Sequence, residues 1–160
     1  MIILGIDPGT TAIGFALLEC GRPPRLIESG LLAITSRETT ERLGELHRAL
    51  SAIITRARPD VMAVEKLFFA KNAKTAMDVA QARGAILLTA ALHGITVVEY
   101  APREIKKALT GDGGADKEQV KKMVILTMPE AAGLTASDDV FDAIASAVAC
   151  CFQEKLHLRG

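Results

Sequence analysis

Carboxylate side chains are the residues of this sequence whose positions most clearly suggest chemistry. Asp7 follows the apolar run Ile2 to Ile6, and Glu65 ends a second apolar run that begins at Asp60. Short runs of this kind are typical of buried strands, and in open α/β sheets functional sites form at the carboxyl ends of the strands. We therefore expect Asp7 and Glu65 at one edge of a sheet.

A second acidic group opens the last helix that the sequence predicts, from Asp138 to Gln153 with Ser137 as its N-cap. Asp139 and Asp142 are three residues apart, so they project from the same face of this helix. If the helix packs near both strand ends, four carboxylates converge.

Such a cluster requires cations, because carboxylates that converge in a site of low dielectric constant repel one another strongly. Oxygen ligands select Mg²⁺, with Mn²⁺ as an alternative. Two such ions about 4 Å apart can activate water and stabilise the leaving oxygen in phosphodiester hydrolysis. The ligand set therefore predicts a hydrolase with two metal ions per active site.

Three of the carboxylates also have a structural explanation. Asp7 suits the Pro-Gly turn that follows it, and Asp138 and Asp139 suit the first turn of a helix, where the macrodipole favours negative charge. Glu65 and Asp142 lie in otherwise apolar segments, where an unpaired carboxylate costs free energy. The joint occurrence of these acids favours a function.

The rest of the pattern predicts one α/β domain over residues 1–160, with a mixed five-stranded sheet flanked by helices. Strands are expected at 2–6, 12–18, 26–34, 60–65 and 96–100, the first three as an antiparallel meander. Helices are expected at 43–57, 72–91, 103–109, 117–128 and 138–153. Asp116 and Gln119 are typical of a capping box, and Ala76, Ala80 and Gly84 form a stripe of small residues on the second helix.

Charge is balanced in total and uneven along the chain. Lys plus Arg and Asp plus Glu number 19 each, yet residues 71–122 hold nine basic and six acidic side chains, and residues 123–160 hold two and five. A nucleic-acid surface would therefore depend on how charge is distributed, and the basic middle of the chain is the candidate.

The cysteines and the apolar segments indicate the compartment. Cys20, Cys150 and Cys151 are odd in number and have no CxxC spacing, which predicts neither a disulfide framework nor a zinc site. The first residues lack a signal-peptide pattern, and the longest apolar stretch, 85–100, is interrupted by His93 and Gly94. We expect a soluble, cytoplasmic protein without a membrane segment.

Four stretches, spread along nearly the whole chain, resemble successive motifs of the RuvC family of Holliday-junction resolvases. They are MIILGIDPGTTAIGFALLE, VEKLFFAKNAKTAMDVAQARGAI, VVEYAPREIKKALTGDGGADKEQV and DDVFDAIASAVA. The resemblance implies a ribonuclease-H-like fold, a homodimer, and magnesium-supported paired nicks in four-way junction DNA, in concert with the RuvA-RuvB branch-migration complex. It places the catalytic and metal-binding acids at Asp7, Glu65, Asp139 and Asp142, and Asp138 stays open as a further ligand.

Candidate DNA contacts fall in the basic middle and just before it. Phe68, which follows Glu65 closely, could stack on an unpaired base at the junction centre, with packing in the core as the alternative. The resemblance assigns Phe68 to the junction and matches Lys106 and Lys117, on either side of a Gly-rich loop, to lysines that the family uses at DNA. The full candidate set is Phe68, Lys71, Arg83, Lys106 and Lys117.

Three other functions fit part of the pattern. The turn Ile-Asp-Pro-Gly-Thr-Thr also resembles the phosphate-binding turn of actin-like and sugar-kinase ATPases, but those folds need two such domains and leave the acids of the last helix unexplained. A non-catalytic junction-binding module would not need the acids, and a general ribonuclease H would not need the segment from Phe68 to Arg83. The sequence therefore favours a structure-selective endonuclease of DNA recombination and repair.

Overall fold

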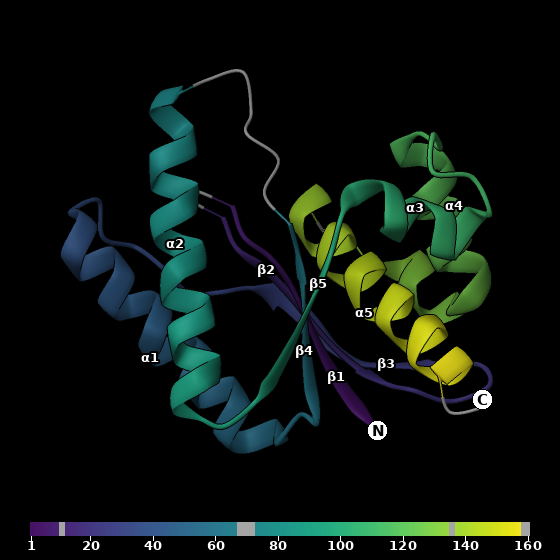
Figure 1. Cartoon of the computed structure of the whole chain (residues 1–160), viewed down its shortest axis with the longest axis horizontal. Coiled ribbons are helices and arrows are strands. Elements are labelled where there is room, and N and C mark those ends of the chain that lie inside the picture. The colour runs from purple at the N-terminus through teal and green to yellow at the C-terminus, as the bar shows by residue number, and fades with distance from the viewer. Residues whose placement is uncertain (10–11, 67–72, 135–136, 158–160) are drawn as a thin grey trace.

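A single mixed sheet of five strands organises the computed structural model, which describes residues 1–9, 12–66, 73–134 and 137–157 (Figure 1). The strand order is β3-β2-β1-β4-β5, with β1 paired antiparallel to β2, β2 antiparallel to β3, and β4 parallel to both β1 and β5. The strands are β1 (Ile2–Asp7), β2 (Gly14–Glu19), β3 (Arg25–Leu31), β4 (Val61–Glu65) and β5 (Thr96–Tyr100). This topology confirms the predicted α/β class and the predicted sheet.

Helices cover both faces of the sheet. On one face lie α1 (Thr39–Ala57) and α2 (Ala73–Leu92), and on the other lie α3 (Pro102–Thr110), α4 (Lys117–Thr127), the 3-10 helix η1 (Pro129–Gly133) and α5 (Asp138–His157) (Figure 1). Successive side chains of a strand point to opposite faces, so Leu4 and Ile6 join the core under α1 and α2, and Ile3 joins the core under α5. The sheet therefore separates two hydrophobic cores.

The helices and strands agree with the predicted ones within a few residues at their ends. The first helix begins at Thr39, earlier than predicted, because the Glu38 carboxylate accepts a hydrogen bond from the Glu41 backbone N–H and caps it. The capping box of Asp116 and Gln119 before α4 is confirmed in both directions. Within the described ranges, no helix is long and apolar enough to cross a membrane.

The last helix crosses the sheet in direct contact with β1 and β2, because both strands carry glycine at the crossing. A Cβ atom at Gly5 would collide with the backbone of Ala143, and one at Gly14 would collide with the backbone of Asp139. The buried face of α5 in this region is itself made of small side chains such as Ala143 and Ala147. These glycines therefore decide how closely the acidic end of α5 approaches the sheet.

The cysteines correct one expectation. Cys20 and Cys151 form a disulfide with a Cα–Cα separation of 5.4 Å, although they are 131 residues apart in sequence. Cys20 directly follows β2, and Cys151 lies on α5, which packs on that strand. The prediction of no disulfide was wrong because it rested on local spacing, whereas the fold brings together cysteines from opposite ends of the chain.

Candidate metal and DNA site

Asp7 and Glu65 end two neighbouring parallel strands. The register pairs Ile6 of β1 with Val64 of β4, so the next residues, Asp7 and Glu65, lie side by side at the carboxyl edge of the sheet. Both continue the face of their strands that points toward α5, since Ile3 and Ala63, an even number of residues earlier, pack in the core under that helix. The two carboxylates therefore face the same helix.

The helix they face begins with the other acids. Asp139 and Asp142 are partly buried, and the Asp142 side chain is 34% exposed against 77% for Asp138. Ser146, fully buried one turn further on, donates its hydroxyl to the backbone carbonyl of Asp142 at 3.0 Å. The inward positions of Asp139 and Asp142 favour them over Asp138 as partners of the two strand-end acids.

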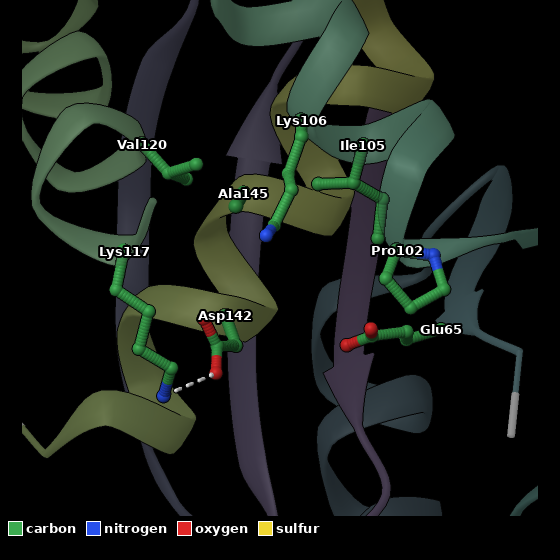
Figure 2. Close-up of a pocket in the computed structure, with 8 residues that line it drawn as sticks. All are labelled: Glu65, Pro102, Ile105, Lys106, Lys117, Val120, Asp142 and Ala145. Carbon is green, nitrogen blue, oxygen red and sulfur yellow. Dashed lines mark ion pairs between the residues drawn. The ribbon is translucent and has the colours of Figure 1, made fainter. Parts of the chain in front are cut away.

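Between the acids lies a pocket of about 140 Å³. Figure 2 shows Glu65 pointing across it toward Asp142, whose carboxylate is turned toward Lys117, with Lys106 reaching in from α3. Its other lining residues are apolar: Pro102, Ile105, Val120 and Ala145. The pocket therefore combines carboxylates, cationic side chains and an apolar wall.

The electrostatics confirm that the acids interact. Burial, together with the negative charges of Asp142, Glu65 and Asp139, raises the pKa of Asp7 to about 7 against the opposing effect of Lys117. Burial followed by the charge of Asp142 also raises the pKa of Glu65, which Lys117 and Lys106 partly offset. These acids carry more negative charge than the surrounding protein compensates.

The pKa of Asp142 is raised as well, mainly by burial. The neighbouring Asp138 and Asp139 add to that rise, while the charge and hydrogen bond of Lys117 oppose it. Lys117 Nζ lies 3.3 Å from Asp138 Oδ2 and 3.3 Å from Asp142 Oδ2. Burial lowers the pKa of Lys117, but these acids outweigh that effect and raise it overall. The ammonium group is thus already engaged with the acidic cluster.

The donor set fits a hard divalent cation. All candidate ligands are carboxylate oxygens, they come from three elements, and the raised pKa values of Asp7, Glu65 and Asp142 mark an uncompensated negative charge. As the side chains lie, no three metal-binding groups of the described chain stand close enough to enclose an ion. Side-chain adjustment, including the Asp142 carboxylate that contacts Lys117, would therefore accompany metal binding.

The predicted DNA contacts have different outcomes. Lys106 and Lys117 line the pocket beside Glu65 and Asp142. The Arg83 guanidinium on α2 forms an ion pair with Glu99 on β5 and is not among the residues lining that pocket. Phe68 and Lys71 lie outside the described residues. The structure thus gives Arg83 an intramolecular partner that the sequence analysis did not foresee.

Sequence reasoning missed the apolar wall of the pocket and the glycines beneath it. Pro102, Ile105 and Val120 belong to helices whose periodic apolar residues indicate a core face, and that pattern does not distinguish a core from a pocket wall. Gly5 interrupts an otherwise apolar strand, and an isolated glycine in a strand is a known indication of close backbone approach. That signal was available in the sequence.

Comparison with known proteins gives a consistent result. Residues 3–151 match the family model described as "Crossover junction endodeoxyribonuclease RuvC". Proteins of that name from Moorella thermoacetica and Chloroflexus aurantiacus are 45% and 47% identical to the chain, over 92% of it and 89% and 91% of their own lengths. The structure of Thermus thermophilus RuvC in complex with Holliday junction substrate superposes with a TM-score of 0.88 at 32% identity, covering 98% of this chain and 96% of that one.

Proposed function

The chain belongs to the RuvC family of crossover junction endodeoxyribonucleases, and from this premise we propose that its clustered carboxylates cut four-way junction DNA with the help of divalent metal ions. Its function is that of a Holliday-junction resolvase, a nuclease of DNA recombination and repair with the ribonuclease-H-like fold. The observation that supports the proposed active site is that Asp7 and Glu65 end neighbouring strands facing α5, where the charge of Asp142 raises the pKa of both. The family match favours neither an ATPase nor a non-catalytic binding module.

We assign metal binding to Asp7, Glu65, Asp139 and Asp142. When bound, two Mg²⁺ ions, or Mn²⁺ in their place, supply activation of a water molecule and charge stabilisation of the departing 3′ oxygen. The protein's part is to hold four carboxylates on rigid elements, so that little reorganisation is needed during the reaction. Paired nicks made in this way leave 5′-phosphate and 3′-hydroxyl ends.

The lysines of the pocket are proposed to hold the DNA backbone. Lys106 and Lys117 lie beside the acids and provide positive charge where a phosphate must approach a negatively charged site. The proposed contact of Arg83 with DNA rests on the sequence alone, since its guanidinium pairs with Glu99 in the structure. The proposed roles of Phe68, in stacking on a base, and of Lys71, in phosphate contact, rest on the sequence alone.

A homodimer suits a junction of near two-fold symmetry, and α2 is its proposed interface. The face of α2 that joins the core carries Ala82, Ile86 and Ala90, whereas Ala80 and Gly84 of the small-residue stripe are exposed. Three large apolar side chains of the same helix are also exposed, namely Met77, Leu88 and Leu92. The described face of α2 is therefore suited to another copy of the chain.

Action in the cytoplasm with a RuvA-RuvB complex is proposed on the family relationship.

The assignment of the acids is tested on a synthetic four-way junction with Mg²⁺. We expect Glu65→Gln and Asp142→Asn each to lower cleavage by at least about 10³-fold, because each removes a ligand of the proposed metal pair. Junction binding, measured with chelator present, should be equal or tighter, since less negative charge repels the phosphates.

Two controls complete this test. Thermal unfolding of both variants checks that the fold is retained, and Glu118→Gln removes an exposed carboxylate of α4 without touching the proposed ligands. Cleavage that persists in the folded Glu65 and Asp142 variants would remove these residues from the proposed active site.

A further inference from the structure

Lys117 lies between the proposed metal ligands and the proposed DNA-binding surface. It is the first residue of α4, and its ammonium group contacts carboxylate oxygens of both Asp138 and Asp142 at 3.3 Å. Figure 2 shows the contact with Asp142. The same Asp142 is a proposed metal ligand, and the same Lys117 is a proposed phosphate contact. One side chain therefore links the metal ligands to the DNA-binding surface.

The contact with Asp142 cannot persist unchanged beside a bound divalent ion. The ammonium group and the ion would both be held at Asp142, at a separation where like charges repel strongly in a partly desolvated site. The Lys117 side chain is 64% exposed and ends in water, so its ammonium group can turn outward at small cost. The lysine is the mobile partner of this pair.

Resting on the proposed metal site, we propose that Lys117 is an internal competitor of the divalent cation: it neutralises Asp142 in the metal-free protein and is displaced when the ion binds. Displacement frees the ammonium group for a DNA phosphate. Because coupling between two ligands is reciprocal, a phosphate that attracts Lys117 away from Asp142 strengthens metal binding in turn. The lysine would thus delay metal loading until DNA is present.

Other charges around Asp142 do not offer the same competition. Lys106 faces the pocket from α3 and lowers the pKa of Glu65, but it forms no ion pair with an acid among the described residues. Asp7 on β1 and Glu65 on β4 add negative charge, which attracts metal and lysine alike. Within the described chain, Lys117 is the cation that opposes the raised pKa of Asp142.

The test is a binding measurement without DNA. Full-length protein is freed of metal with chelator and titrated with Mn²⁺ at low ionic strength, and free Mn²⁺ is read by electron paramagnetic resonance. We expect Lys117→Met to bind Mn²⁺ about fivefold more tightly than the unchanged protein, the factor set by a half-exposed ion pair. Lys117→Arg, which keeps the charge, should bind Mn²⁺ as the unchanged protein does.

Matched variants separate this inference from the proposed function. Lys122→Met removes an equal charge from the exposed side of α4 and should leave the affinity unchanged, and Asp142→Asn should weaken it. If Asp142→Asn weakens Mn²⁺ binding while Lys117→Met leaves it equal or weaker, the proposed competition by Lys117 is wrong and the proposed metal site is retained. If Asp142→Asn has no effect, or if no variant binds Mn²⁺, the metal site itself is wrong.

Thermal unfolding confirms the fold of each variant, and Lys117→Gln serves as a second neutral replacement if Lys117→Met does not fold. The difference between Lys117→Met and the unchanged protein should shrink as salt is added, because screening weakens an exposed ion pair. A difference that is independent of salt would contradict a direct electrostatic competition.

Discussion

Asp7 is the side chain whose protonation state matters most for the proposed metal site. Its carboxylate is partly buried beside Glu65, Asp139 and Asp142, and its pKa is raised from 3.8 to about 7. A carboxyl group that is neutral at mild pH cannot serve as a metal ligand, so a proton and a cation compete for it. The same group also lowers the stability of the metal-free fold once it ionises.

The pH dependence follows from this pKa with a defined sign. Because the folded-state pKa of Asp7 lies above its unfolded value, its contribution to stability is complete below about pH 4 and is lost as pH rises through about 7. In metal-free protein we therefore expect the free energy of unfolding to fall between these pH values, and Asp7→Asn to remove that component of the decline. Denaturant unfolding at several pH values measures both.

The activity should change in the opposite direction. At subsaturating Mg²⁺, junction cleavage should rise as pH increases through about 7, since Asp7 must lose its proton to bind metal. The midpoint should move to lower pH as Mg²⁺ is increased. A midpoint that does not depend on Mg²⁺ would separate the titration of Asp7 from metal binding.

Among the elements, α5 matters most, because it carries two of the four proposed ligands to the edge of the sheet. Its approach depends on Gly5 and Gly14, where a Cβ atom would meet the backbone of Ala143 and of Asp139. The Cys20–Cys151 disulfide ties the far end of the same helix to the end of β2. The position of the acids therefore depends on contacts along the whole helix.

Gly5→Ala tests this dependence. The added methyl group meets backbone and not a flexible side chain, so α5 must shift, and we expect the free energy of unfolding to fall by about 2–3 kcal/mol. Mn²⁺ affinity should fall with it, because Asp139 and Asp142 move away from Asp7. Chemical denaturation and Mn²⁺ titration measure the two effects.

The matched control is Gly133→Ala in η1, where a Cβ atom would meet nothing within 4 Å. It should change neither stability nor Mn²⁺ affinity by a measurable amount. If Gly5→Ala behaved like this control, the close approach of α5 would not depend on the glycine.

The molecule as a whole exposes an apolar helix face that the described chain does not cover. Met77, Leu88 and Leu92 of α2 are 64%, 60% and 68% exposed, and the small residues Ala80 and Gly84 lie exposed on the same helix. The small residues allow another helix to approach closely, and the large apolar side chains stay exposed to solvent unless a partner covers them. It supports the proposed homodimer.

Leu88→Glu is expected to shift the chain from dimer to monomer, since a charge cannot be buried at an apolar interface without a partner. Sedimentation or light scattering reads the mass directly. Leu126→Glu, at an equally exposed apolar residue of α4, is the control and should not change the mass. A dimer that survives Leu88→Glu but not Leu126→Glu would move the interface to the opposite face of the sheet.

Much of this architecture could be predicted from local patterns. The apolar runs before Asp7 and Glu65 predicted β1 and β4, because strand periodicity and strand ends are local properties. The acids at the ends of these strands predicted a functional site at that edge of the sheet. The capping box at Asp116 was equally local and is confirmed. The exact ends of α1 and β3 were not predicted, since capping contacts and strand pairing decide them.

By itself, the sequence determined the class of fold and the family, because both depend on local patterns of residue types, and it also supplied the acids proposed for the site. The tertiary structure alone decided that Lys117 engages Asp138 and Asp142, that Arg83 pairs with Glu99, and that Cys20 meets Cys151. These pairings join residues far apart in the chain, and no local pattern encodes which of many possible partners a side chain will reach. Only the packing of α5, α4 and the sheet brings such partners within contact distance.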